Sequence, residues 1–200
     1  MFKQTLLIVL LSSLIVVSGC QVFRQVASLS QLDFALSGVV SPRLAGVDLD
    51  SVRSPDDVSP TDMVRLGTAV LRDDLPFDFT LLVSAGNPES NSVDARMMRL
   101  DWTLLLDDRE TVSGFTEPDV LISPGSTAEI PTVVSLNLLE FFDSGLPDLI
   151  DLALAVAGQG GDAKRVKLQA TPTVSTSLGP IKYPQPIIIV SREVGGLQRR

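Results

Sequence analysis

The sequence contains no histidine, and this absence removes several kinds of chemistry at once. Imidazole is the usual general base of a hydrolytic triad and a common zinc ligand, so neither kind of site can be built on it here. Ser/Lys and paired-carboxylate mechanisms stay open. The aspartate pairs at 56–57, 73–74 and 107–108 fall at expected element ends, where solvated turn carboxylates are the ordinary interpretation. We therefore expect no enzymatic activity, no metal and no cofactor.

Cysteine occurs once, at Cys20, directly after an apolar run. A single thiol cannot form an intramolecular disulfide, so the fold must be held by its apolar core. Lys3 followed by the apolar stretch 6–17 has the order of a secretory signal. A helix of about 12 residues rises about 18 Å, too little for the ~30 Å hydrocarbon core of a bilayer. We therefore expect residues 1–19 to be a cleaved signal peptide and not a permanent membrane span.

The segment Val17-Ser18-Gly19-Cys20 resembles the bacterial lipobox, which has an aliphatic residue, two small residues and then cysteine. The resemblance implies that the Cys20 thiol carries a diacylglycerol and that the mature chain begins there, anchored to a membrane by its acyl chains. The alternatives are an ordinary signal peptide that contains a cysteine, and a buried apolar cysteine. Gln21 follows in place of the aspartate that favours inner-membrane retention. This implies the outer membrane, facing the periplasm, if the source is a double-membrane bacterium.

Basic residues are few, with 16 Lys and Arg against 24 Asp and Glu and a net charge of −8. Removal of residues 1–19 takes away Lys3 and makes the net charge −9. Nucleic acids and anionic lipid surfaces attract basic clusters, so we expect neither as an electrostatic partner. The segment DLDSVRSPDD lacks the spacing of a calcium loop, and GQGGD at 158–162 lacks the Lys and Ser/Thr of a phosphate loop.

Apolar and polar residues alternate over several segments, which is typical of half-buried antiparallel strands. The clearest examples are residues 77–85 and 98–106, where Arg99, Asp101 and Thr103 are expected to face outward. We expect the following residues to face the core: Leu32, Phe34, Leu36, Phe77, Phe79, Leu81, Val83, Ala85, Met98, Leu100, Trp102, Leu104, Leu106, Val134, Leu136, Leu138, Val166, Leu168, Ala170 and Val174.

Two segments have helical spacing instead. The first begins at Ser59, a good N-cap before Pro60, and its apolar stripe comprises Met63, Leu66, Gly67 and Val70. The second covers 144–157 and ends at Gly158; its apolar arc is unusually broad. Such an arc predicts a helix covered on most sides, either within the core or as a lid over a lipid-binding space.

Short strands, Pro/Gly turns and two helices predict a mainly β protein, an antiparallel immunoglobulin/fibronectin-like β-sandwich with two helical insertions. We assign residues 20–30 to a lipidated N-terminal tether and residues 31–190 to this domain. Residues 191–200 are polar and Gly-rich, and we expect a disordered tail. The length suits a single domain that can bury enough apolar surface without disulfides.

The order of the strands and turns resembles the type 2 late-embryogenesis-abundant (LEA) proteins, whose water-stress and hypersensitive-response (WHy) domain is known in plants and bacteria. The resemblance rests on LLVSAGNPESNSV, RLDWTLLLDDRETVSG, a Pro-Gly turn and IPTVVSL. The usual family motif is Asn-Pro-Asn, whereas this chain has Asn87-Pro88-Glu89. The resemblance implies a sandwich of about seven strands without enzymatic activity, linked to desiccation or envelope stress.

For Asn87 and Pro88 we predict structural roles, in which the Asn87 side chain caps backbone N–H groups of the turn and Pro88 ends the strand ladder. The function expected is that of a membrane-anchored, non-catalytic envelope lipoprotein, a stress-related protective or protein-binding module. The alternative is a carrier or accessory lipoprotein for lipids or another hydrophobic ligand, with its cavity between the 144–157 helix and the sheet.

Overall fold

The structure is a computed structural model and describes residues 32–91, 93–159, 166–176 and 179–190. The predicted signal peptide, Cys20, the tether and the C-terminal tail lie outside the described residues. The strands are β1 (Asp33–Leu44), β2 (Val47–Asp48), β3 (Pro76–Gly86), β4 (Ala95–Leu106), β5 (Arg109–Thr116), β6 (Val120–Ile122), β7 (Thr127–Asn137), β8 (Val166–Thr176), β9 (Gly179–Lys182) and β10 (Ile187–Val190). The helices are η1 (Pro55–Asp57), α2 (Pro60–Leu71), α3 (Leu138–Phe141) and α4 (Leu146–Val156).

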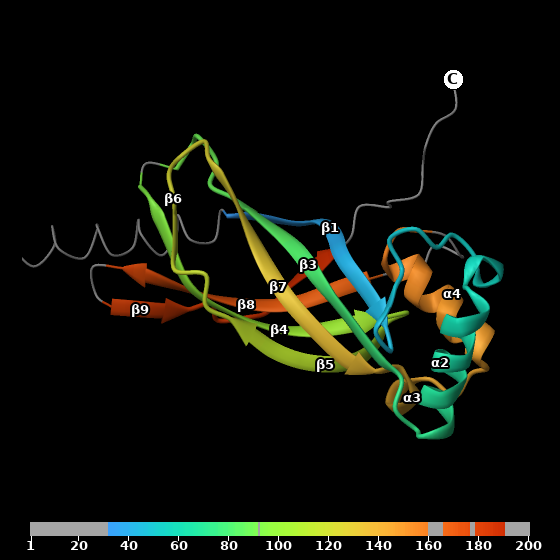
Figure 1. The fold of residues 1–200 in the computed structure, drawn as a ribbon. Coiled ribbons are helices and arrows are strands. Elements are labelled where there is room, and N and C mark those ends of the chain that lie inside the picture. Colours follow the sequence, from blue (N-terminus) through green and yellow to red (C-terminus); the bar gives the residue numbers. More distant parts are fainter. Residues whose placement is uncertain (1–31, 92, 160–165, 177–178, 191–200) are drawn as a thin grey trace, which may run out of the picture.

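The strands form two antiparallel sheets that lie one over the other (Figure 1). The first sheet has the order β2-β1-β3-β7. The second has the order β10-β8-β4-β5, with β6 paired to β4 and β9 paired to β8. One cluster of buried apolar residues joins the inner faces of both sheets. The predicted class, a mainly β antiparallel sandwich, is confirmed.

Strand β3 lies at the centre of the first sheet and has a complete alternation of buried and half-buried residues. Its five predicted inward residues are Phe77, Phe79, Leu81, Val83 and Ala85, and each is at most 3% exposed. The strand pairs along its whole length with β7 from Pro76↔Asn137 to Gly86↔Thr127. Because every second residue of β3 is buried and the strand is paired on both sides, only one register buries its apolar face.

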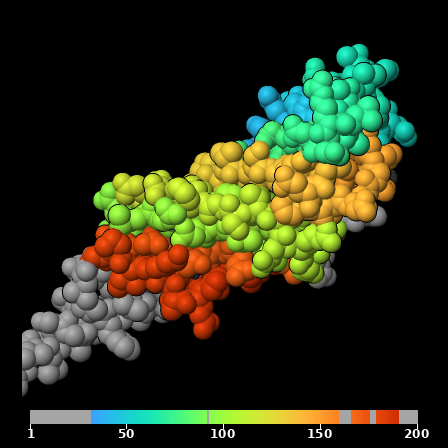
Figure 2. Space-filling view, turned by 90° about the horizontal axis from the view of Figure 1, so that it is seen from below, coloured from blue at the N-terminus to red at the C-terminus, as the bar shows by residue number. Residues whose placement is uncertain are grey.

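The helices gather at one end of the sandwich (Figure 1), and the space-filling view shows an elongated domain with the α2 segment at that end (Figure 2). Ser59 caps α2 by accepting a hydrogen bond from the Asp62 backbone N–H at 3.1 Å, and Leu66 is fully buried. Helix α4 contributes Leu149, Ile150, Leu152, Ala153, Leu154 and Val156 to the buried cluster. The broad apolar arc therefore belongs to the packed core. The short helices η1 and α3 were not predicted, and Leu138 is buried in α3 instead of in a strand.

The prediction is wrong for one core residue, Met98. Met98 is 37% exposed, whereas its neighbour Met97 is fully buried. The register of β4 against β8 shifts between Met97↔Val174 and Arg99↔Thr173, so Met98 is the extra residue of a β-bulge. The bulge shifts the alternation by one residue. Met98 and Arg99 therefore both face outward, and from Leu100 onward every second residue again faces the core.

Candidate functional site

The Asn87 side chain lies in a buried turn after β3 and is 1% exposed. Its Nδ2 donates hydrogen bonds to the backbone carbonyls of Val93 at 3.1 Å and Ile122 at 2.8 Å. Its Oδ1 accepts one from Nδ2 of Asn91 at 2.6 Å. The side chain therefore holds two carbonyl groups, and not the backbone N–H groups that we expected it to cap. Through Ile122 it ties the end of β3 to the end of β6.

The backbone around Asn87 adds two more bonds to the same junction. The Asn87 N–H donates to the Ser126 carbonyl at 2.9 Å, and the Gly125 N–H donates to the Asn87 carbonyl at 2.7 Å. The ladder of β3 ends at Gly86, and the carbonyl of Pro88 accepts from the Asn91 N–H at 3.0 Å, which closes the turn. These contacts close the turn and fix the end of β3 against the segment before β7, so their role is structural.

A second candidate lies on the outer face of the six-stranded sheet, beside the bulge. We call it the outer-face hollow; its volume is about 670 Å³. Arg96, Met98 and Arg99 come from β4, Glu117 and Asp119 from the β5–β6 connection, and Thr173, Ser175 and Pro180 from β8 and β9. The bulge is what brings Met98 and Arg99 to this surface together, and bulges often re-aim side chains at functional positions.

Arg96 forms a bidentate ion pair with Asp119 at one side of the hollow. Its Nε lies 2.8 Å from Oδ1 and its Nη2 lies 2.9 Å from Oδ2. These hydrogen bonds raise the pKa of Arg96 and lower the pKa of the Asp119 carboxyl, with the attraction between the two charges acting in the same sense. Both side chains are more than half exposed, so the pair fixes an orientation more than it stabilises the fold.

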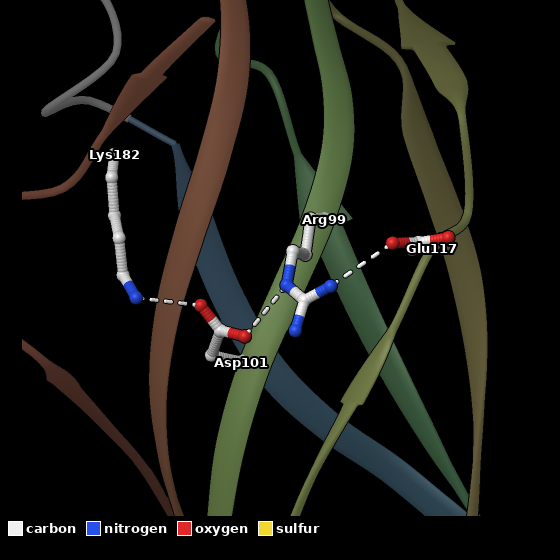
Figure 3. A network of polar contacts seen from close by, with 4 residues as sticks. All are labelled: Arg99, Asp101, Glu117 and Lys182. Atoms are coloured by element: carbon white, nitrogen blue, oxygen red, sulfur yellow. Dashed lines mark hydrogen bonds and ion pairs between the residues drawn. The ribbon is translucent and has the colours of Figure 1, made fainter.

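Arg99 is held by a larger network, drawn in Figure 3. Its Nε donates to Oδ1 of Asp101 at 2.7 Å, and its Nη1 donates to Oε1 of Glu117 at 3.0 Å. Lys182 on β9 lies 2.7 Å from Oδ2 of Asp101. The hydrogen bond from Lys182, and then the one from Arg99, lowers the pKa of the Asp101 carboxyl. Asp101 therefore stays ionised and connects β4 to β9.

The guanidinium of Arg99 also stacks on an exposed aromatic ring. Its central carbon lies 3.7 Å from the ring centroid of Phe115, which is 57% exposed. A cation over an aromatic face at this distance is attracted by the ring quadrupole. Two carboxylates and a ring thus hold Arg99 in one orientation.

The chemistry of this arrangement favours binding over proton transfer. General acids and bases work best with a pKa near the working pH, and both carboxyls whose pKa is shifted here, Asp101 and Asp119, move away from neutrality. The hollow instead presents hydrogen-bonding groups in fixed positions. Among the described residues, no group of three or more potential ligands is placed to hold a metal ion, and no described helix has the length and apolarity to cross a membrane.

The sequence pattern predicts that Arg99 and Asp101 face outward, but it does not mark the residues of the hollow as a group. Their partners are distant in sequence. The pairing of β4 with β5 brings Glu117 beside Arg99, and the pairing of β4 with β8 and of β8 with β9 brings Lys182 beside Asp101. One local signal was present. In Arg96-Met97-Met98-Arg99 two adjacent apolar residues leave the phase of the alternation undecided, which is a sequence in which a bulge fits.

A comparison with protein-family models finds no match, and no curated protein matches the chain. Three solved structures are similar to it at low identity. A protein from Archaeoglobus fulgidus is 12% identical over 58% of this chain and 82% of its own, with a TM-score of 0.35. A protein provisionally described as ApaA from Bordetella pertussis is 15% identical over 80% and 95%, with a TM-score of 0.34. A protein provisionally described as late embryogenesis abundant is 14% identical over 90% and 83%, with a TM-score of 0.36. All three TM-scores are low.

Proposed function

We propose that this chain is a lipid-anchored protein of the cell envelope whose β-sandwich is a non-catalytic binding module of the type 2 LEA kind, with a protective role under stress. The outer-face hollow carries the proposal. It gathers fixed charged groups and an exposed apolar residue, Met98, on the outside of a sheet whose inner face is the core. Exposed groups held this firmly suit recognition of a partner, since less conformational freedom is lost on binding.

The anchor is Cys20, within the lipobox-like segment of the sequence. The first strand begins at Asp33, 13 residues later, and a chain of that length spans at most about 45 Å when fully extended. The sandwich then stays close to the membrane that holds the acyl chains. In a double-membrane bacterium this is the outer membrane, with the domain facing the periplasm.

The test of the anchor is fractionation of a Cys20→Ser variant expressed from the full-length gene. We expect the wild-type protein in the membrane fraction and the variant in the soluble fraction, because a thiol is required for the thioether to the diacylglycerol. Two or three acyl chains give stable anchoring, so the difference is near complete. A Cys20→Ser protein that still partitions with membranes contradicts the anchor.

The test of the binding role is recovery of the lipidated protein from its native envelope, with mass spectrometry of bound proteins, glycans and lipids. Arg96→Gln removes the charge of one arginine in the hollow, and Arg65→Gln on α2 is its matched control, because both arginines are exposed and each is paired with one aspartate. We expect envelope components that co-purify with the wild type and with Arg65→Gln but not with Arg96→Gln. Equal recovery by all three proteins contradicts a binding role for the hollow, and recovery of lipids alone favours the carrier alternative.

A further inference from the structure

We propose that the outer-face hollow binds an uncharged carbohydrate, a short segment of a glycan chain. The inference rests on the proposed function, since it names the ligand class of the same site. It depends on four properties of the hollow: its charge balance, its unused hydrogen-bonding groups, the apolar residues among them and its open shape.

The charges in the lining cancel. Arg96 and Arg99 bring two positive charges, and Glu117 and Asp119 bring two negative charges. An anionic ligand is attracted by the two arginines but repelled by the two carboxylates. A cationic ligand is attracted by the carboxylates but repelled by the arginines. Like charges brought together at an interface oppose binding by their repulsion. A ligand without net charge avoids this cost and can still use every polar group.

The polar groups supply both donors and acceptors. Arg99 uses Nε and Nη1 on its carboxylate partners and keeps Nη2, whereas Arg96 uses Nε and Nη2 and keeps Nη1. Glu117 uses Oε1, which leaves Oε2 as an acceptor. The hydroxyls of Thr173 and Ser175 can do both. Vicinal sugar hydroxyls also donate and accept, so they match a site in which guanidinium and carboxylate groups alternate.

These groups are held in place before any ligand arrives. Asp101 lies between Arg99 and Lys182 (Figure 3). The ring of Phe115 packs against the Arg99 guanidinium. Asp101 thus orients Arg99, and Lys182 in turn holds Asp101. Preorganisation matters more for a saccharide than for most ligands, since each of its hydrogen bonds replaces one to water and the net gain per bond is small.

Met98 and Pro180 supply apolar surface inside the same lining. A pyranose ring has C–H groups on its faces, and these pack on exposed apolar side chains. Met98 is available only because the bulge turns it outward, as its 37% exposure shows. The unbranched thioether of methionine adapts to surfaces of different shape.

The size and shape of the hollow agree with a segment of a chain. Its volume of about 670 Å³ lies within the ~300–1,000 Å³ range of ligand sites. It is a depression on the outside of a sheet, formed by β4, β8, β9 and the β5–β6 connection, and not a cavity enclosed by the core. The depression is open to solvent, so a chain longer than the hollow can extend beyond it.

The test uses the full-length protein expressed in a bacterial host and purified in detergent, with chitotetraose, cellotetraose and maltotetraose as uncharged probes and inorganic phosphate as the anionic probe. Calorimetry measures binding at about 50 and 500 mM salt, where charge–charge attraction is screened to different extents. We expect at least one tetrasaccharide to bind with an affinity that changes less than about twofold between these conditions.

The Arg96→Gln variant is expected to bind that tetrasaccharide about tenfold more weakly, as the loss of one charge-assisted hydrogen bond implies. The matched control Arg65→Gln is expected to bind like the wild type. Circular dichroism must show all three proteins folded alike, which is expected because Arg96 is more than half exposed.

Three results overturn the inference: binding of phosphate in preference to all three sugars, tetrasaccharide binding that Arg96→Gln leaves unchanged, or no binding of any tetrasaccharide by folded wild type. The two experiments together distinguish a failure of the glycan inference from a failure of the proposed function. If the envelope recovery finds a protein partner that depends on Arg96 while no sugar binds, the binding module stands and its glycan specificity is wrong. If Arg96→Gln changes neither experiment, both are wrong.

Discussion

Replacement of Asn87 by alanine removes three side-chain hydrogen bonds from one buried turn. The amide loses its bonds to the Val93 and Ile122 carbonyls and to the Asn91 side chain. Each bond contributes about 1 kcal/mol net, and the loss is larger where a buried group, such as the Ile122 carbonyl, is left without its partner. We therefore expect Asn87→Ala to lower the free energy of unfolding by about 3–4 kcal/mol.

The assay is urea unfolding followed by Trp102 fluorescence, with the melting temperature from circular dichroism as a second measurement. For a domain of this size, the expected loss corresponds to a fall of about 10 °C in melting temperature. Pro88→Ala is the neighbouring control, and we expect it to lose less than about 1 kcal/mol, because alanine keeps the carbonyl that accepts from the Asn91 N–H.

Asn87→Asp sharpens the test, since it keeps the shape of the side chain but replaces the NH₂ donor by a carboxylate oxygen. That oxygen would face the carbonyls of Val93 and Ile122, so the variant should be at least as unstable as Asn87→Ala at neutral pH. Our reasoning is refuted if Asn87→Ala stays within about 1 kcal/mol of the wild type, or if Asn87→Asp is as stable as the wild type.

Two further predictions concern β5 and β4. Gly114→Ala is expected to cost about 2 kcal/mol and to shift the Trp102 emission to longer wavelength, because its Cβ would lie 2.6 Å from Cζ2 of Trp102. Asp101→Asn is expected to cost about 1 kcal/mol at pH 7 and less near pH 2. The sign follows from its folded pKa, which lies below the usual 3.8, so its stabilisation is present above that value and is lost as the pH falls through the folded pKa.

The control for Gly114→Ala is Gly38→Ala on β1 of the other sheet, and the control for Asp101→Asn is the comparison of the two pH values. Gly38 has nothing within 4 Å of an added Cβ, so Gly38→Ala should stay close to the wild type. A Gly114→Ala protein as stable as Gly38→Ala would show that the Trp102 ring can move away. For Asp101→Asn, an equal loss of stability at both pH values would mean that its ionised form is not what stabilises the fold.

The core of β3 was predictable because its burial repeats with the period of the strand. Its five inward residues occupy alternate positions without interruption, and neighbours on both sides leave no other register. Helix α4 was predictable for a similar reason, since its broad apolar arc can be buried only by contact on most sides. In both segments the pattern is local, and tertiary structure agrees with it.

The phase of β4 before Leu100 was not predictable, because Met97 and Met98 are both apolar and either can face the core. The shifted pairing with β8 decides between them. The direction of the Asn87 hydrogen bonds was also beyond the sequence. An asparagine amide can donate or accept, and here the Val93 and Ile122 carbonyls come within reach of its Nδ2.

The alternating strands, the two helices, the turn at Asn87-Pro88 and the lipobox-like segment at Cys20 can be read from the sequence, because each depends on residues close together in the chain. The residues that line the outer-face hollow meet only in the folded domain. Strand pairing brings Glu117 to Arg99 and Lys182 to Asp101, and one β-bulge turns Met98 and Arg99 outward together. Pairing between distant strands depends on the packing of the whole sandwich, so it cannot be predicted from a local sequence pattern.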